Sequence, residues 1–302
     1  NPINRNIKVT QKGETILFII NPAAGENSKG KIPSIIKKNI DTGRFDPAIV
    51  YSQGPGDATR IAAENLAKGI HKIVAVGGDG TVNEVAKALI NTQATFGIIP
   101  LGSGNGLGRH LRLPLNTGRA VRVINRDRVA MMDYGTINQI PFFCTAGVGF
   151  DAYIGHMYSL LTKRGFTNYA KVTLKEFFRY RPEIYTVRSN GHSLTKEAFL
   201  ITVANASQFG NNAYIAPNAD VSDGLLDVTI LSPFPKYLSP WFGIKLFSRK
   251  LTNSRYIEMF RVKDFTIIRQ EPGFVHYDGE PALMEEHLNF SVKPMGLNVF
   301  IP

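Results

Sequence analysis

The chain contains one cysteine among its 302 residues, so no disulfide can form within it. That residue, Cys144, lies in the apolar run 142–146, which predicts a buried strand residue. No apolar run approaches the roughly 18 residues that a membrane-spanning helix needs. Residues 1–12 also lack the apolar core of a signal peptide. We therefore expect a cytoplasmic protein, and a peripheral position at the inner face of a membrane stays open.

Acidic residues are scarce: 24 Asp and Glu stand against 35 Lys and Arg, giving a formal charge of +11. This excess favours an anionic partner such as a nucleotide, a nucleic acid or an acidic membrane surface. The basic residues are scattered and accompany no nucleic-acid module, so we expect no nucleic acid partner. With 43% hydrophobic residues the chain is globular in composition, and its length favours two domains.

The pattern of elements changes near residue 133. Before it, apolar runs alternate with helical stretches, which predicts a mostly parallel sheet covered on both faces. After it, runs rich in β-branched and aromatic residues predict a second, β-rich domain with two helices. The predicted strands are 16–20, 48–51, 73–76 and 96–99, then 142–146, 184–188, 198–204, 225–231 and 265–269; the helices are 30–39, 57–68, 81–90 and 117–125, then 152–161 and 169–178.

Two glycine-rich turns, at 77–80 and 102–108, each follow an apolar strand and precede a candidate helix. Backbone amides at such a helix start attract an anion, and glycine lets the backbone approach it closely. Two such turns in one α/β sheet predict a nucleotide site. Residues 25–32 nearly match a P-loop but end in Ile32 instead of Ser or Thr, which favours a polar loop. Residues 147–152 resemble a dinucleotide fingerprint in the wrong half of the chain, which disfavours a dehydrogenase.

Two acidic clusters each allow two interpretations. Asp220, Asp223 and the carbonyl of Leu225 are spaced to hold one hard cation, but Asp-Gly also predicts a plain hairpin turn. Asp278 and Glu280 stand on a tight turn, where a carboxylate can accept a proton during phosphoryl transfer or serve the turn alone.

Four motifs together resemble the diacylglycerol kinase and sphingosine kinase catalytic superfamily, of the bacterial lipid kinase type. They keep its order and spacing across nearly the whole chain. The Gly-Gly-Asp-Gly-Thr motif by itself is shared with NAD kinases, whereas the four together are specific. They are Asn-Pro-Ala-Ala-Gly at 21–25, Gly-Gly-Asp-Gly-Thr-Val-Asn-Glu at 77–84, Gly-Ser-Gly-Asn at 102–105 and Asp-Gly-Glu at 278–280.

The resemblance implies an α/β protein of two domains with ATP bound between them. The N-terminal domain would be Rossmann-like (NAD kinase/phosphofructokinase-like), spanning residues 1–133 and completed by a returning strand at 294–302. The C-terminal domain, 134–293, would be β-sandwich-like. The implied reaction is transfer of the γ-phosphoryl group of Mg-ATP to a lipid hydroxyl.

The resemblance also implies roles for particular residues. Asp79 would order the phosphates and Mg²⁺, and Asp220, Asp223 and the Leu225 carbonyl match a structural magnesium site. Asp278 or Glu280 corresponds to the catalytic base, and we rank Asp278 first. The implied nucleotide contacts are Asn21, Ser52, Gly78, Asp79, Gly80, Thr81, Val82, Asn83, Glu84 and Ser103.

One departure leaves the acceptor open between diacylglycerol-like lipids and sphingoid bases: Ser103 and Gly106 stand where bacterial glycerolipid kinases carry Thr and Asp. The alternatives are an NAD kinase-like phosphotransferase and a non-catalytic lipid-binding protein of the same fold. The aromatic and basic segment 233–250 suits a membrane interface, although a helix packed on the core is favoured. The expected partners are ATP and a membrane lipid, and a homodimer stays open.

Overall fold

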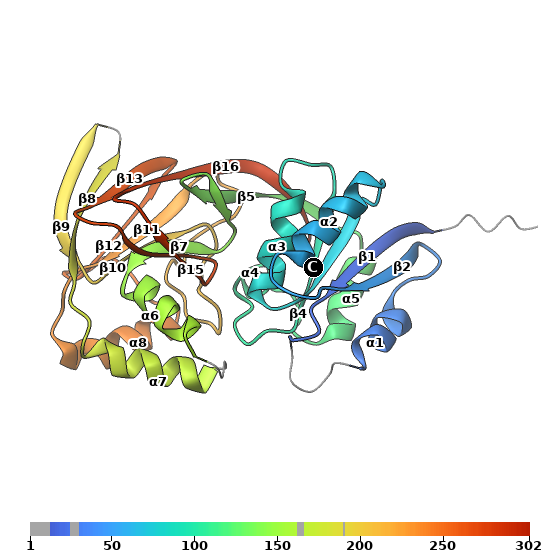
Figure 1. Cartoon of the computed structure of the whole chain (residues 1–302), viewed down its shortest axis with the longest axis horizontal. Coiled ribbons are helices and arrows are strands. Elements are labelled where there is room, and N and C mark those ends of the chain that lie inside the picture. Colours follow the sequence, from blue (N-terminus) through green and yellow to red (C-terminus); the bar gives the residue numbers. More distant parts are fainter. Residues whose placement is uncertain (1–12, 25–29, 162–165, 190) are drawn as a thin grey trace, which may run out of the picture.

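The computed structural model describes residues 13–24, 30–161, 166–189 and 191–302, which form an α/β domain and a β-rich domain (Figure 1). Residues 25–29 of the P-loop-like segment 25–32 lie outside these ranges, so the interpretation of that segment as a polar loop stays a prediction. In the N-terminal domain four parallel strands in the order β2-β1-β3-β4 carry helices on both faces. These elements are β1 (Glu14–Ile20), α1 (Ile32–Asn39), β2 (Phe45–Tyr51), α2 (Asp57–Ala67), β3 (Lys72–Gly77), α3 (Asp79–Leu89), β4 (Thr95–Pro100), α4 (Gly106–His110) and α5 (Thr117–Asn125).

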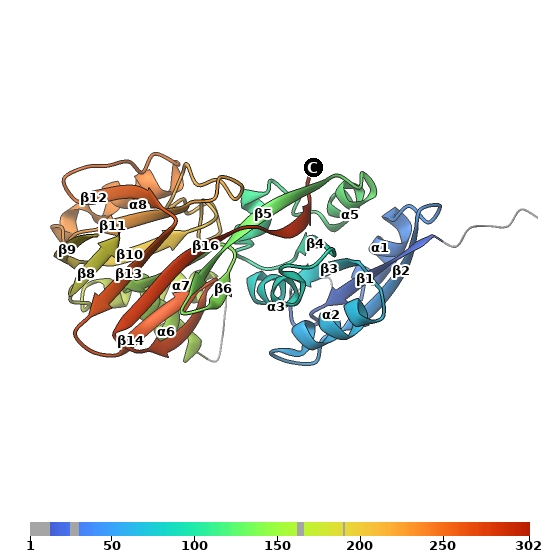
Figure 2. The same cartoon turned by 90° about the horizontal axis from the view of Figure 1, so that it is seen from above.

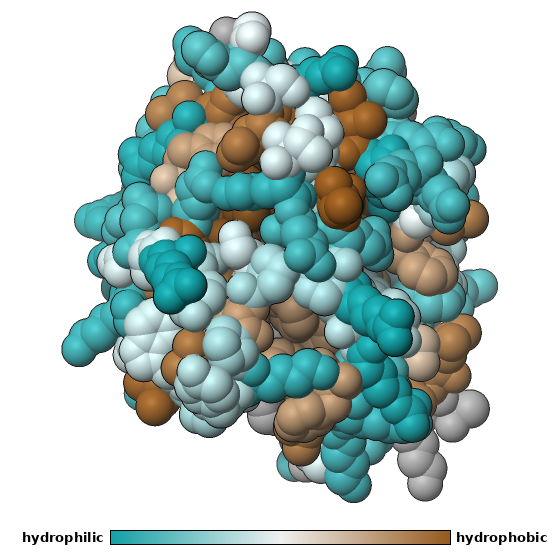
Figure 3. All heavy atoms as spheres, turned by 90° about the vertical axis from the view of Figure 1, so that its left-hand side faces the viewer, coloured by the Kyte–Doolittle hydropathy of each residue, from teal (hydrophilic) through white to brown (hydrophobic). Residues whose placement is uncertain are grey.

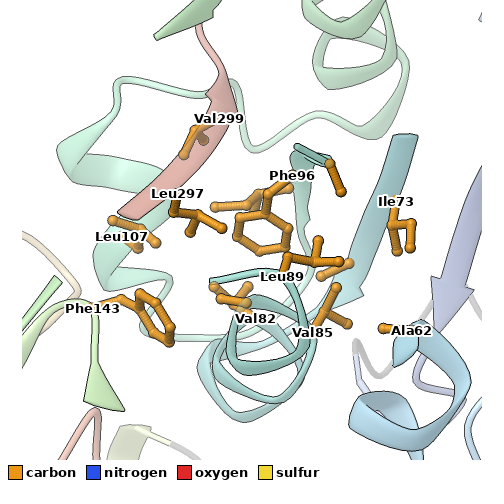
Figure 4. Packing of buried hydrophobic residues seen from close by; sticks show 14 of the residues in the cluster. Ala62, Ile73, Val82, Val85, Leu89, Phe96, Leu107, Phe143, Leu297 and Val299 are labelled. Atoms are coloured by element: carbon orange, nitrogen blue, oxygen red, sulfur yellow. The ribbon is translucent and has the colours of Figure 1, made fainter. Parts of the chain in front are cut away.

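The strands of this domain are buried on both faces, as their unbroken apolar runs predict. Along β1 the side chains alternate between two cores: Leu17 and Ile19 face α2 and α3, whereas Phe18 faces α1 and α5. Figure 4 shows the first core, in which the apolar side of α3 packs against β3, β4 and the C-terminal strand. Buried packing therefore fixes α3, and with it the glycine turn at its start.

The C-terminal domain is a sandwich of two antiparallel sheets around one apolar core. One sheet has the order β12-β11-β10-β7-β14-β15; the other contains β13, β8 and β9 and is continuous with the N-terminal sheet through β16. The elements are β5 (Val129–Ile137), β6 (Ile140–Phe142), β7 (Thr145–Gly149), α6 (Phe150–Ser159), α7 (Phe166–Phe177), β8 (Glu183–Ser189), β9 (His192–Ala198), β10 (Leu200–Ala204), β11 (Leu226–Leu231), the 3-10 turn η1 (Lys236–Leu238), α8 (Ser239–Phe247), β12 (Ile257–Val262), β13 (Asp264–Arg269), β14 (Gly273–Tyr277), β15 (Glu280–Met284) and β16 (His287–Phe300).

Two predicted strands are each divided in two, which corrects the sequence analysis. The run 142–146 breaks between Phe142 and Thr145 because three successive amides there bind a carboxylate instead of a neighbouring strand. The run 198–204 breaks at Phe199, where the chain passes from one sheet of the sandwich to the other: β9 pairs with β8, and β10 pairs with β7 and β11.

Strand β16 joins the two domains, and Figure 2 shows it running from one to the other. Its first half pairs with β13, and its end pairs in parallel with β4 through Asn298 and Val299. Beside β5 its register shifts between Lys293 and Leu297. The predicted two-domain α/β fold is thus confirmed. The domain boundaries at 133 and 294 stay a prediction, since β5 and β16 belong to both halves.

Helices α6, α7 and α8 cover the outer face of the six-stranded sheet through a cluster rich in aromatic side chains. Figure 3 faces the end of this domain, where apolar side chains lie among more numerous hydrophilic ones. Within the described ranges, no helix is long and apolar enough to cross a membrane.

Candidate functional site

The two glycine turns lie side by side at the carboxyl edge of the parallel sheet, since they follow neighbouring strands β3 and β4. Leu101 N donates to Gly77 O at 2.8 Å, which joins the turns. A Cβ atom on Gly102 would lie 2.6 Å from the Cα of Gly78, closer than any side chain allows. Glycine at these positions is therefore a requirement of the close approach and leaves the backbone exposed to a ligand.

Asp79 ties the first turn to the second. Its carboxylate accepts hydrogen bonds from Asn105 N (2.9 Å) and Gly106 N (2.7 Å), at the start of α4. Burial raises the pKa of the Asp79 carboxyl above its ordinary value; these two amides oppose the rise, and the nearby charge of Asp278 adds to it. A Cβ on Gly104 would lie 2.6 Å from the Asp79 carboxylate, so the turn closes on Asp79 only with glycine there.

Backbone amides at the start of α3 are not used in the hydrogen bonds of the helix. The first bond of α3 runs from Val82 N to Gly78 O, so the amides of Gly80 and Thr81 have no partner within the helix. The side chain of Asn21, just after β1, donates to the Thr81 hydroxyl at 3.1 Å. This edge therefore offers backbone donors and a hydroxyl at the positive end of a helix, which suits phosphate oxygens.

The remaining predicted nucleotide contacts lie around this edge in different settings. Ser52, directly after β2, is buried and its amide donates to Ile20 O at 3.0 Å, whereas Ser103 is exposed. Both carboxylate oxygens of Glu84 accept amides at the start of α2, from Gly56 (2.9 Å) and Ala58 (3.0 Å). Glu84 therefore fastens α2 to α3.

Asp278 connects the C-terminal domain to α3. It lies at φ 50° in the turn between β14 and β15, and its carboxylate accepts four hydrogen bonds. Burial raises the pKa of this carboxyl, and the four donors oppose the rise. The donors are Phe143 N (2.8 Å), Cys144 N (2.7 Å), Thr145 N (3.2 Å) and the Asn83 side-chain nitrogen (2.7 Å).

The side chain of Phe143 also contributes to the junction between the C-terminal domain and α3. Its ring belongs to the buried core of the N-terminal domain, beside Val82 and Leu107 (Figure 4), while its amide holds Asp278. Cys144 is buried next to it, as predicted, but it lies between β6 and β7 and not within a strand; burial raises the pKa of its thiol. Sequence reasoning placed Asp278 in the site but missed its partners, because 143–145 looked like the interior of a strand.

Glu280 differs from Asp278 in its surroundings, although only Gly279 separates them. Glu280 is exposed, and its carboxylate accepts no hydrogen bond from the residues that the structure describes. A Cβ atom on Gly80 would lie 3.5 Å from Glu280 Oε1, so the carboxylate stands over the first turn of α3. The carboxylate of Asp278 is thus filled by hydrogen-bond donors of the protein, whereas the carboxylate of Glu280 is accessible to a ligand.

A second polar cluster beside the turn was not assigned a role from the sequence. Asp151, at the start of α6, accepts the Thr202 hydroxyl at 2.6 Å and pairs with His276 Nε2 at 3.0 Å. His276 is buried and precedes Asp278 by two residues. The pair anchors β14 to α6, and only the glycine-rich sequence before Asp151 hinted at it.

The predicted cation site at 220–225 is a turn in which the two carboxylates accept hydrogen bonds from groups of the same turn. Asp220 accepts the Ser222 amide (3.0 Å) and hydroxyl (2.7 Å), and Asp223 accepts the Leu225 amide at 3.0 Å. The guanidinium of Arg261 lies 3.4 Å from the other Asp223 oxygen. Among the described residues no three His, Cys, Asp or Glu side chains group closely enough to hold a metal. The oxygen donors suit a hard cation, but Arg261 competes for one of them.

Two family models match this chain in succession. Residues 15–137 match the diacylglycerol kinase catalytic domain, and residues 144–301 match the YegS C-terminal NAD kinase beta sandwich-like domain. This chain belongs to the YegS-like lipid kinase family. A protein named probable lipid kinase YegS-like from Pseudomonas aeruginosa (strain UCBPP-PA14) is 30% identical over 96% of this chain and 95% of its own length. Another of that name, from Pseudomonas putida, is 30% identical over 82% of each chain.

A solved structure supports the fold of this YegS-like chain. A diacylglycerol kinase from Bacillus anthracis str. Sterne superimposes with a TM-score of 0.76 over 96% of this chain and 98% of its own, at 22% identity. At that identity the likeness speaks for the architecture alone.

Proposed function

We propose that this protein is an ATP-dependent lipid kinase that transfers the γ-phosphoryl group of Mg-ATP to a lipid hydroxyl. The observation that carries the proposal is the joined pair of glycine turns with the Glu280 carboxylate standing over the start of α3. Phosphoryl transfer requires positioning and charge stabilisation more than covalent chemistry, and this edge provides donors for phosphate and a carboxylate for the acceptor.

The proposed nucleotide contacts are the turn 78–81, with Asn21 holding the Thr81 hydroxyl at 3.1 Å. We keep Ser52, Val82, Asn83, Glu84 and Ser103 as residues that border or support the nucleotide. The amides of Gly80 and Thr81, which have no partner within α3, fit phosphate oxygens and support the assignment of this edge to ATP.

Asp79 is the proposed group for holding Mg²⁺ at the phosphates, since a carboxylate is the oxygen donor that this ion prefers. Bound Mg²⁺ would neutralise charge on the phosphoryl group. Hydrogen bonds from the amides of Asn105 and Gly106 hold the Asp79 carboxylate against the start of α4. For the second cation, the turn holding Asp220, Asp223 and the Leu225 carbonyl stays a proposal in competition with Arg261.

The contacts reverse our ranking of the two candidate bases. Asp278 already accepts four hydrogen bonds, which uses the acceptor sites of both its oxygens. Glu280 is exposed and accepts none from the described residues. We propose that Glu280 takes the proton of the acceptor hydroxyl, and that Asp278 positions the turn that carries Glu280.

The geometry also bears on the departure at Gly106. A Cβ atom there would lie 3.2 Å from Cys144 Sγ and 3.2 Å from Phe209 O, so this chain has little room for an aspartate. The loop at Phe209 fills that space. We propose that the acceptor is recognised without a carboxylate at this position, which leaves diacylglycerol-like and sphingoid acceptors as the two classes to compare.

The test is ATP consumption by the purified protein with Mg²⁺, against diacylglycerol, monoacylglycerol and sphingosine in mixed micelles and NAD in solution. Lipid-dependent ADP formation that is lost in Asp79→Ala supports the proposal. Turnover on NAD alone would show an NAD kinase-like enzyme. Lipid binding without ADP formation would show a non-catalytic lipid-binding protein.

A further inference from the structure

The outward side of α7, η1 and α8 carries large apolar side chains that the fold does not cover. Figure 1 shows α7 and α8 along the lower side of the C-terminal domain. We call this surface the helical face, defined by six residues that are 39% to 79% exposed. They are Leu174, Phe178, Tyr237, Trp241, Ile244 and Phe247.

Helix α8 is apolar on both of its sides. Its inner side is explained by packing: Phe242 is buried, with its ring centroid 4.3 Å from that of Phe234. Its outer side continues from η1 as Tyr237, Trp241 and Ile244, spaced i, i+4 and i+7, which places them along one stripe. Packing against the sheet accounts for the inner side of α8 only.

Helix α7 and the residue directly after it add a stripe in which cations and apolar groups alternate. Lys171, Leu174, Lys175 and Phe178 are spaced i, i+3, i+4 and i+7, and all four are exposed. Long lysine stems can lie along an apolar surface while their ammonium groups reach outward. Such a stripe is typical of a helix lying at a charged interface.

Contacts at the end of α7 make the two stripes one surface. Lys236 Nζ donates to the Phe178 carbonyl and lies 5.6 Å from the centre of the Phe178 ring. Beneath it, the rings of Phe177 and Phe234 lie 6.0 Å apart. The segment before α8 is thereby fixed against the end of α7.

The charge of this surface has one sign. Residues 166–181 and 232–256 contain nine Lys and Arg but a single acidic residue, Glu176. Glu176 is only 3% exposed, and its carboxylate accepts the Tyr153 hydroxyl at 3.2 Å. It also pairs with Arg179 (3.6 Å) and Lys175 (3.9 Å), so it offsets part of the positive charge from beneath the surface, and the exposed charges are cations. At the level of these helices, the lower part of Figure 3 shows brown apolar side chains mixed with teal hydrophilic ones.

We propose that the helical face docks on an anionic lipid bilayer. Trp241, Ile244 and Phe247 enter the interfacial region, and the lysines of α7 contact anionic headgroups. Aromatic side chains favour the interface, and each nearby cation adds attraction to anionic lipid. Lys245 Nζ lies 4.2 Å from the centre of the Trp241 ring, which sets a cation beside this aromatic group. That docking gives the enzyme access to a lipid acceptor rests on the proposed function. The docking on a bilayer does not depend on it.

Intrinsic tryptophan fluorescence reports on the helical face directly, because Trp241 is the single tryptophan of the chain. We would titrate the full-length protein with vesicles of phosphatidylglycerol and phosphatidylcholine in equal parts, and with phosphatidylcholine vesicles alone. The expected result is a blue shift of Trp241 emission with the anionic vesicles and quenching by brominated lipid. No shift and no co-sedimentation with anionic vesicles would overturn the proposal.

Two variants separate docking from other effects. Ile244→Glu with Phe247→Glu should weaken partitioning about 100-fold, roughly tenfold for each apolar side chain withdrawn. The matched control, Leu115→Glu with Met131→Glu, adds the same charge at exposed positions outside the helical face and should bind like the wild type. Equal loss in both pairs would overturn the proposal. So would a wild-type dimer that the first pair alone dissociates, since the face would then bind a second copy.

A third arm keeps this proposal distinct from the kinase proposal. Turnover of an acceptor dissolved in detergent micelles should survive Ile244→Glu with Phe247→Glu, whereas turnover on anionic vesicles should fall. Vesicle binding without turnover on any lipid would leave docking standing and remove the kinase. Turnover in micelles without vesicle binding would do the reverse.

Discussion

The exchange of each turn carboxylate for its amide separates the two roles that we assign to Asp278 and Glu280. In Asp278, one oxygen accepts Asn83 and Phe143 and the other accepts Cys144 and Thr145. Asparagine keeps one of these oxygens and presents an NH₂ group to the other pair of donors. Two hydrogen bonds are therefore lost, and two donors are left without an acceptor.

The magnitude follows from these contacts. A hydrogen bond to a charged acceptor contributes about 1.5–3 kcal/mol, and relief of the buried charge offsets part of the loss. We expect Asp278→Asn to lower the free energy of unfolding by roughly 2–4 kcal/mol. Glu280→Gln removes no hydrogen bond from the described residues, so its unfolding free energy should change by less than about 0.5 kcal/mol.

The assay is urea unfolding at pH 7 for both variants, together with ATP turnover at a temperature where both are folded. Loss of a general base costs about 10² to 10⁴-fold in rate, so Glu280→Gln should be stable and nearly inactive. A Glu280→Gln variant with wild-type turnover would refute the assignment of the base. An Asp278→Asn variant as stable as the wild type would refute the positioning role.

Three further predictions concern pH, close packing and metal. Burial lowers the pKa of His110 from 6.5 to about 4. The folded protein therefore favours neutral His110, which contributes roughly 3 kcal/mol at most to the free energy of unfolding above pH 6.5. This contribution is lost as the pH falls from 6.5 to 4. Unfolding of His110→Gln across that range should lack this part of the slope, and an unchanged slope would contradict it. Gly102→Ala, whose Cβ would lie 2.6 Å from Gly78 Cα, should lose about 1–3 kcal/mol and ATP affinity in calorimetry, while Gly54→Ala, with open space around its Cβ, should keep both. Mg²⁺ should raise the melting temperature of the wild type more than that of Asp220→Asn; an equal rise in both would argue against a cation at that turn.

The local sequence pattern was sufficient to predict most strands and both glycine turns of the N-terminal domain. Its strands read as apolar runs because both faces are buried, and the glycines at 77–78 and 102 mark the two turns because nothing larger fits between them. The fold class was therefore predictable. The resemblance carried by four short motifs extended the prediction to candidate site residues, and Asn21, Asp79 and Glu280 among them lie around one edge of the sheet.

Long-range contacts were not predictable. Asp278 binds amides at 143–145, more than 130 residues earlier, and those amides interrupt what reads as one strand. The same contacts leave Glu280 exposed, which is why the base that we propose differs from Asp278, the residue that the sequence analysis ranked first. Segment 233–250 was favoured as a packed helix, and Phe242 is buried accordingly; the exposed side, with Ile244, follows from where the sheet lies and not from the helix itself.

The most direct test of the central claim is transfer of label from [γ-³²P]ATP to lipid. Wild type, Glu280→Gln and Leu283→Gln, an exposed neighbour on β15, would be incubated with Mg²⁺ and each acceptor, and label extracted into organic solvent would be counted. The account predicts labelled lipid with the wild type and Leu283→Gln and almost none with Glu280→Gln. Absence of labelled lipid with every acceptor, or equal labelling by Glu280→Gln, would contradict it.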